Sequence, residues 1–151
     1  MRAQIDEKHL IEASTRFWEQ MVAIKLNPEP IQQQFCVGRQ HLLGRIDLSG
    51  AWNGRVEIRM AVDLARVATA AMLMQPLETV ADADMMDALS EVANMVAGAI
   101  KSSLPQPCQM SLPHAAVEDC NFCAEEPALN AIGVAFRHHS GKMEVRVWED
   151  E

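Results

Sequence analysis

Apolar positions near the N-terminus follow the spacing of a helix. Within residues 6–24 the apolar side chains recur at helical intervals, and Asn27 with Pro28 forms a stop signal. We therefore predict a helix from about Lys8 to Ile24. Its apolar face comprises Leu10, Ile11, Phe17, Met21 and Ile24.

Two later regions alternate apolar and polar residues, which is typical of strands with one buried face. After the stretch "FCVGRQ" at 35–40, residues 45–48 and 55–60 alternate on either side of a Gly/Asn turn, which predicts an antiparallel hairpin. The C-terminal segment alternates around Ser140 and Gly141 and predicts a second hairpin. Apolar positions of these strands are Ile46, Leu48, Val56, Ile58, Met60, Met143, Val145 and Val147.

Helical spacing returns between the two hairpins. Residues 62–74 predict one helix, with Asp63 as its cap or first-turn acid. An acidic loop at 75–84 leads to another helix from about Asp84 to Leu104, which ends before Pro105. With no linker or internal repeat, residues 1–151 predict a single α+β domain, in which helices cover an antiparallel sheet built from hairpins.

The helix at 84–104 has two distinct faces at about 100° per residue. Asp87, Glu91 and Asn94 are spaced by four and three positions, so their side chains project together on the outer face. The core face comprises Ala88, Leu89, Val92, Val96, Ala99 and Ile100, and the remaining outer positions are Ser90, Gly98, Lys101 and Ser102, with Met95 at the edge.

Asn94 and Gly98 are unfavourable choices for the solvent side of a helix. Glycine at an exposed interior position costs about 1 kcal/mol relative to alanine, and asparagine is a mediocre helix former. Gly98 either clears an approach for another molecule, with Glu91 and Asn94 beside it, or packs tightly against a loop of the same chain. The alternative for the whole face is an ordinary solvated surface.

Charge and composition exclude several classes of function. The formal net charge is -8 and basic residues form no cluster, so nucleic acid and anionic membranes are poor partners. Neither an apolar signal core nor a run of about 18 to 20 apolar residues is present, which predicts a cytoplasmic protein. The four cysteines, Cys36, Cys108, Cys120 and Cys123, are then expected to be reduced thiols.

The spacing of Asp87, Glu91, Asn94 and Gly98, followed by "SLP" at 111–113, resembles the motif of the CheC/CheX/FliY chemotaxis phosphatases. The stretch "LSGAWNGRVEIRMAVDLARVATAAML" at 48–73 is similar to the hairpin and helix that precede this motif in the CheX branch. The resemblance extends over about Phe17 to Pro113, with a looser match in the final hairpin.

This resemblance implies a phosphatase for the aspartyl phosphate of a CheY-type response regulator in two-component signalling. Asn94 would enter the partner's active site and hold the attacking water, Glu91 would pair with the receiver's lysine, and Asp87 would cap or position. The Mg²⁺ would belong to the receiver domain, so no cofactor or metal is expected on this chain. The resemblance also implies a homodimer formed through the sheets. Because the first helix lacks E-x-x-N, one active helix per chain is expected.

Other readings stay open from the sequence alone. The same face could serve a non-enzymatic binding module for a receiver or flagellar-type partner. Cys108, His114, Cys120 and Cys123 could form a tetrahedral zinc site, although only one close ligand pair is present. A thiol hydrolase using Cys120 or Cys123 is a weaker alternative. His138 and His139 are expected as exposed residues at a turn, and most methionines as core filler, with Met85, Met86 and Met95 near a partner surface.

Overall fold

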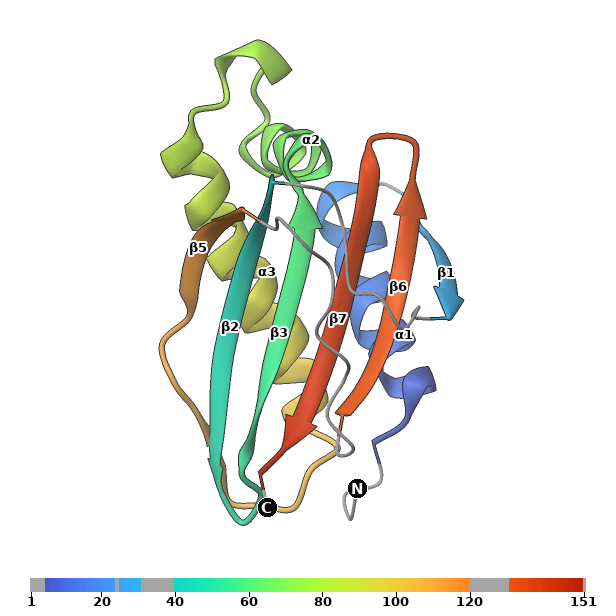
Figure 1. The fold of residues 1–151 in the computed structure, drawn as a ribbon, viewed down its shortest axis with the longest axis vertical. Helices are drawn as coiled ribbons and strands as arrows, with labels where there is room; N and C mark the ends of the chain where they lie inside the picture. Colours follow the sequence, from blue (N-terminus) through green and yellow to red (C-terminus); the bar gives the residue numbers. More distant parts are fainter. Residues whose placement is uncertain (1–4, 24, 31–39, 120–130, 151) are drawn as a thin grey trace.

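The computed structural model describes residues 5–23, 25–30, 40–119 and 131–150. One seven-stranded antiparallel sheet carries the helices on a single face, as Figure 1 shows. This arrangement confirms the predicted α+β class. In chain order the elements are α1 (Glu7–Phe17), a π-helix (Trp18–Val22), β1 (Asn27–Pro30), β2 (Gln40–Gly50), β3 (Gly54–Ala61), α2 (Val62–Leu73), a 3-10 helix (Leu77–Thr79), α3 (Asp82–Lys101), β4 (Cys108–Met110), β5 (His114–Asp119), β6 (Ala131–His138) and β7 (Gly141–Glu149).

Both predicted hairpins form and supply the centre of the sheet. The strand order is β1-β6-β7-β3-β2-β4, with β5 also pairing with β2. Ile46 lies opposite Val56 in the first hairpin, and Ile58 lies opposite Val145 where the two hairpins join. Side chains from the two hairpins therefore line one continuous inner face under the helices.

That inner face is the core of the domain. The predicted apolar positions of the strands are all buried, and α1, α2 and α3 cover them with apolar side chains of their own. Burying an aliphatic side chain of this size stabilises a fold by roughly 1.5–3 kcal/mol relative to leaving it exposed. The buried members on the strands are Leu42, Ile46, Leu48, Val56, Ile58, Met60, Val134, Phe136, Met143, Val145 and Val147.

The helix α3 lies unusually close to strand β2 at Gly44. A Cβ atom on Gly44 would lie 3.1 Å from Cγ of Leu89 and 3.4 Å from Cβ of Ala93, both on α3. Side chains at this strand position would meet the helix, so the missing Cβ lets the two elements pack closely. The contact determines which side of α3 is turned inward.

The N-terminal helix differs from the prediction at its C-terminal end. The α-helix stops at Phe17, a π-helical turn follows to Val22, and Ala23 adopts a left-handed conformation with φ of 54°. The consecutive rings of Phe17 and Trp18 are both buried, edge to face with centroids 5.4 Å apart. Met21, predicted on the core face, is 47% exposed. The helical segment ends before the predicted stop at Asn27 and Pro28, which begin β1. Residues 35–39 of the stretch "FCVGRQ" lie outside the described residues.

The helix α3 also has different ends from those predicted. It begins at Asp82 because the Asp84 carboxylate accepts a hydrogen bond from the Ala81 N–H at 3.1 Å, which satisfies a free donor of the first turn. It ends at Lys101, after which tighter turns continue to the buried Leu104. Part of the predicted acidic loop is the 3-10 helix Leu77–Thr79. Asp63 is a first-turn acid of α2 and caps nothing with its side chain.

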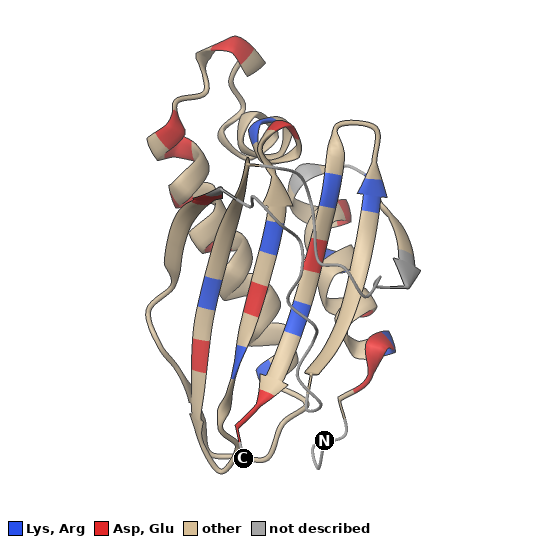
Figure 2. Cartoon of the chain, in the orientation of Figure 1, with Lys and Arg blue, Asp and Glu red and all other residues tan. Residues whose placement is uncertain are grey.

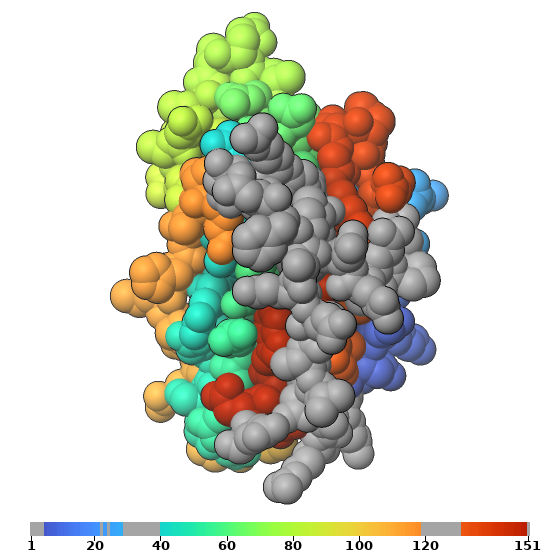
Figure 3. Space-filling view, in the orientation of Figure 1, coloured from blue at the N-terminus to red at the C-terminus, as the bar shows by residue number. Residues whose placement is uncertain are grey.

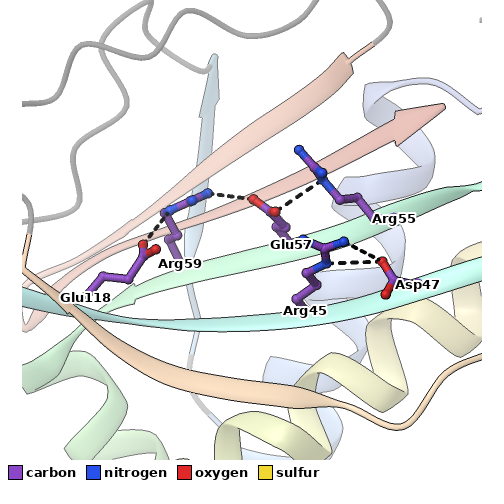
Figure 4. A network of polar contacts seen from close by, with 6 residues as sticks. All are labelled: Arg45, Asp47, Arg55, Glu57, Arg59 and Glu118. Carbon is purple, nitrogen blue, oxygen red and sulfur yellow. Dashed lines mark hydrogen bonds and ion pairs between the residues drawn. The ribbon is translucent and has the colours of Figure 1, made fainter. Parts of the chain in front are cut away.

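The sheet face away from the helices is lined with charges of alternating sign, visible as bands along β2, β3 and β7 in Figure 2. Arg45 lies opposite Glu57, and Glu57 lies opposite Arg146 on the next strand. Figure 4 shows how Glu57 also bridges its neighbours on β3, with Arg55 Nε at 3.2 Å and Arg59 Nη1 at 2.9 Å. Opposite charges therefore face one another across the strands, and ion pairs join neighbours along β3.

Two carboxylates on this face have pKa values shifted in opposite directions. Partial burial of Glu118 acts to raise its pKa, but hydrogen bonds from His41 at 2.8 Å and Arg59 at 3.2 Å, with the charge of Arg59, outweigh burial and lower the pKa. Burial raises the pKa of Glu144 against the opposing pull of Lys142 and Arg146. Burial likewise lowers the pKa of Arg146 to about 10.

Replacing Gly44 with valine should force α3 away from β2. We expect Gly44→Val to lower the free energy of unfolding by about 1–3 kcal/mol, the usual cost of overfilling a packed core. Urea denaturation measures this change, and Ser49→Val, at an exposed position of the same strand, is the control. A Gly44→Val protein as stable as the parent would show that the close contact is not needed.

Glu118 and Glu144 should affect the pH dependence of folding stability in opposite directions. Because its pKa is lowered on folding, ionised Glu118 stabilises the parent relative to Glu118→Gln near neutral pH, and this advantage should disappear as pH falls below the ordinary value of 4.5. Glu144→Gln should instead gain stability relative to the parent as pH rises from 4.5 through the raised pKa. Urea denaturation of the three proteins across pH tests both, and parallel pH profiles would contradict them.

Candidate functional site

The outer face of α3 carries the residues singled out by the sequence. Asp87 and Glu91 are exposed, and Asn94 and Gly98 are half-exposed on the same side of the helix. The opposite side is buried against β2 and the neighbouring helices, as predicted, except that Ala99 is half-buried. Buried positions of α3 are Met85, Ala88, Leu89, Val92, Ala93, Val96, Ala97 and Ile100.

The helix geometry brings Glu91 and Asn94 together. Their Cα atoms are separated by three residues, which is about 4.5 Å along the helix axis, and Asp87 lies about 6 Å further toward the N-terminus. Within the described part of the chain, no hydrogen bond or ion pair engages the side chains of Asp87, Glu91 or Asn94. A carboxylate and an amide therefore project from a rigid helix with their polar atoms available.

Gly98 faces open space. A Cβ atom on this residue would meet no described atom within 4 Å beyond the helix itself. Tight packing against a loop of the same chain, one of the two explanations for this glycine, therefore finds no support among the described residues. Clearance for another molecule beside Asn94 and an ordinary solvated surface are the two explanations that agree with this open space.

The chemistry of this arrangement suits recognition and water positioning. A carboxylate can pair with a cation, and a carboxamide can accept one hydrogen bond and donate two. Among the residues described, no three His, Cys, Asp or Glu side chains are grouped as metal ligands. Nor is any helix in this part of the chain long and apolar enough to span a bilayer.

The sheet register separates two of the four residues of the alternative zinc site. Cys108 pairs with Gly50 and His114 pairs with Arg45, so they lie five residues apart along β2, about 16 Å. Ligands of one zinc ion each lie within about 2.3 Å of the metal, so these two side chains cannot share it. Cys108 is instead buried beside the carbonyl of Trp52. The other two proposed ligands, Cys120 and Cys123, lie outside the described residues, as does Cys36.

The structure also places the remaining candidate residues, which are two histidines and three methionines. His138 is half-buried at the end of the β6–β7 hairpin, 4.0 Å from the ring of exposed His139. Met85 was expected near a partner surface but is only 3% exposed, because it faces the interior between α2 and α3. Met86 and Met95 are half-buried beside the outer face of α3.

Sequence reasoning missed two features around the site. Gly44, which seats α3 on the sheet, carries no signal of its own within a strand pattern. The end of α2 and the turn after it present Leu73, Met74 and Leu77 to solvent, where the sequence predicted the end of a helix and an acidic loop. The apolar residues themselves, at a predicted helix end and within an otherwise acidic loop, were the available signal.

A model of the chemotaxis phosphatase CheX family matches residues 42–127 of the sequence. This match covers more than half of the chain and includes β2, β3, α2 and the whole of α3. The chain belongs to the CheX family of chemotaxis phosphatases. No curated protein matches the sequence significantly.

Solved structures of CheX proteins share the fold along almost the entire chain. The Vibrio vulnificus CheX structure matches with a TM-score of 0.77 and 18% identity, covering 95% of this chain and 98% of the other. CheX from Desulfovibrio desulfuricans gives 0.71 at 19% identity, covering 95% and 97%. A complex of CheX with CheY, BeF3 and Mg²⁺ from Borrelia burgdorferi gives 0.70 at 15% identity, covering 95% and 97%.

Filling the space at Gly98 should stabilise the CheX-family chain. We expect Gly98→Ala to raise the free energy of unfolding by about 1 kcal/mol, because alanine is the better helix former and its methyl group would meet none of the described residues. Urea denaturation provides the measurement, and Gly44→Val should change stability in the opposite direction. A destabilised Gly98→Ala protein would show that this position is packed.

Proposed function

We propose that this chain hydrolyses the aspartyl phosphate of a CheY-type response regulator, with Glu91 and Asn94 as the active pair. The main support is a carboxylate and an amide on the outer face of α3 that have no partner among the described residues and lie next to open space at Gly98, in a member of the CheX family. The Borrelia burgdorferi CheX, which has the same fold, is found in complex with CheY.

The proposed reaction needs little covalent assistance from this chain. Water attacks the phosphorus, the bond between phosphorus and the aspartate oxygen breaks, and free aspartate and inorganic phosphate result. An acyl phosphate is already reactive, so the main requirement is a water molecule held in line with the breaking bond. The Asn94 carboxamide can accept one hydrogen bond from that water and orient it without removing the proton.

Glu91 would set the position of Asn94. Its carboxylate, one helical turn away, would pair with the lysine of the receiver's active site through a charge-assisted hydrogen bond. Because both residues lie on one helix, fixing Glu91 also fixes the direction in which Asn94 enters the partner. Gly98 would let the receiver's backbone approach the same side of α3. Of the two roles expected for Asp87, capping does not fit, because α3 begins at Asp82 and Asp84 makes the hydrogen bond at its N-terminus; Asp87 would position.

The other components of the proposal come from the family resemblance. The receiver domain would supply Mg²⁺ and this chain would supply no cofactor. Formation of a homodimer through the sheets, action in a chemotaxis pathway and a cytoplasmic location stay predictions of the same kind. They do not affect the assignment of Glu91 and Asn94.

Substitution of Asn94 should abolish most of the activity. We expect Asn94→Ala to lower kcat by about 100-fold, since a misplaced reacting group typically costs that much, with little change in partner affinity. Glu91→Ala should mainly raise KM, by about tenfold, through loss of the charged contact. The measurement is the decay of a phosphorylated CheY-type receiver from the same genome at increasing concentrations of each variant.

Gln20→Ala provides a matched control, because Gln20 is an exposed amide elsewhere in the helical layer. This variant should accelerate the decay as the parent does. If Asn94→Ala retained the full acceleration, the proposed mechanism would be wrong. Binding of the receiver by the parent without any acceleration would favour a non-enzymatic binding module.

A further inference from the structure

Three large apolar side chains are exposed together at the connection between α2 and α3. Leu73, Met74 and Leu77 are 49%, 91% and 45% exposed, and we call these three residues the apolar tip. The connection, lime green in Figure 3, protrudes at one end of the molecule beyond the sheet. It lies directly before the N-terminal end of α3, the helix that carries Glu91 and Asn94.

Hydrogen bonds hold the backbone of the tip. The Gln75 N–H donates to the Ala70 carbonyl at 3.0 Å, and the Thr79 hydroxyl donates to the Pro76 carbonyl at 2.7 Å. Val80 is buried at the base of the connection, and its carbonyl accepts a hydrogen bond from Arg66 of α2 at 3.1 Å. The apolar side chains therefore project from an ordered turn.

The exposed side chain of Met74 does not stabilise the fold. It ends α2 in a left-handed conformation with φ of 53°, where glycine is the favoured residue and other residues are strained. Its side chain is also almost fully in water. A glycine at this position would serve the helix end better, so the methionine side chain calls for an explanation outside the folded monomer.

The tip adjoins the N-terminal end of the helix that carries the active pair. Glu91 is nine residues from the first residue of α3, about 14 Å along the axis. A specific interface covers about 800 Å² on each partner, which corresponds to a radius of about 16 Å. An interface of that size centred on Glu91 and Asn94 would reach about as far as Asp82, and one displaced toward the N-terminal end of α3 would include the tip.

The surface between the tip and the active pair is acidic. Asp87 and Glu91 are exposed on the outer face of α3, Asp84 is half-exposed on the same side, and Glu78 is exposed in the connection. A second copy of the chain placed on this surface in a two-fold manner would bring like charges together, and an anionic membrane would be repelled. The surface fits a partner that presents basic side chains beside an apolar patch.

We infer that the apolar tip is a second contact for the phosphorylated receiver domain, which it holds by apolar burial while Glu91 and Asn94 act on the phosphoryl group. This inference rests on the proposed function, because the receiver is the partner that the active pair would bring to α3. The tip would contribute affinity and selectivity for the receiver and take no part in the chemical step.

Substitution at Met74 separates binding from folding. We expect Met74→Gly, and Leu77→Ala as a second variant, to raise the Kd for a CheY-type receiver domain loaded with BeF3 and Mg²⁺ by about tenfold, equivalent to about 1.4 kcal/mol. KM for the phosphorylated receiver should rise equally, while kcat stays within about twofold. Thermal unfolding of Met74→Gly should occur at no lower a temperature than for the parent, since glycine suits the left-handed position.

Met21→Ala is the matched control, because Met21 is an exposed methionine on the π-helical turn after α1. It should leave Kd and KM unchanged. If both tip variants bind the receiver with the Kd of the parent, the inference is wrong. It is also wrong if the tip variants lose dimers in sedimentation experiments while their receiver binding is unchanged. If the parent protein binds the receiver but does not hydrolyse its phosphate, the proposed function is wrong. The Kd values of the tip variants then still show whether the tip contacts the receiver. A parent that binds no receiver overturns the tip as a receiver contact.

Discussion

The close contact between α3 and β2 is the constraint on which the rest of the structure depends. Gly44 lets Leu89 and Ala93 pack directly against the strand, and this contact fixes the rotation of the helix about its own axis. Once the inner side is fixed, a helix with 3.6 residues per turn has no freedom in what it turns outward. Glu91 and Asn94 are therefore presented to solvent by a contact on the opposite side of the helix.

The same contact explains how α3 tolerates unfavourable residues on its outer face. Gly98 costs the helix about 1 kcal/mol relative to alanine, and Asn94 adds a fraction of that. Each large apolar side chain buried on the inner face contributes roughly 1.5–3 kcal/mol, and α3 buries several. The helix is stable because of tertiary packing, which leaves its outer face open to selection for other properties.

Sequence patterns predicted the hairpins and the two faces of α3 because periods of two and 3.6 directly reflect burial. They could not predict the left-handed residues Ala23 and Met74, since neither is the glycine or asparagine that usually marks such a position. The π-helical turn after α1 and the separation of Cys108 from His114 depend on long-range packing and strand pairing. Local spacing alone predicted that Glu91 and Asn94 lie side by side, whereas the apolar tip could be recognised only in the folded structure.

The alternating charges on the other sheet face have a consequence for strand registration. A slip of two residues between β3 and β7 would place Glu57 opposite Glu144 or Arg59 opposite Arg146, and a similar slip between β2 and β3 would place Arg45 opposite Arg55 or Arg59. Each misalignment keeps the apolar face inward, so hydrophobic burial alone would permit it. Like-charge repulsion distinguishes the native alignment from these alternatives. The charged face thus selects the strand alignment that keeps Gly44 beneath Leu89 and Ala93, although these charges lie on the far side of the sheet from α3.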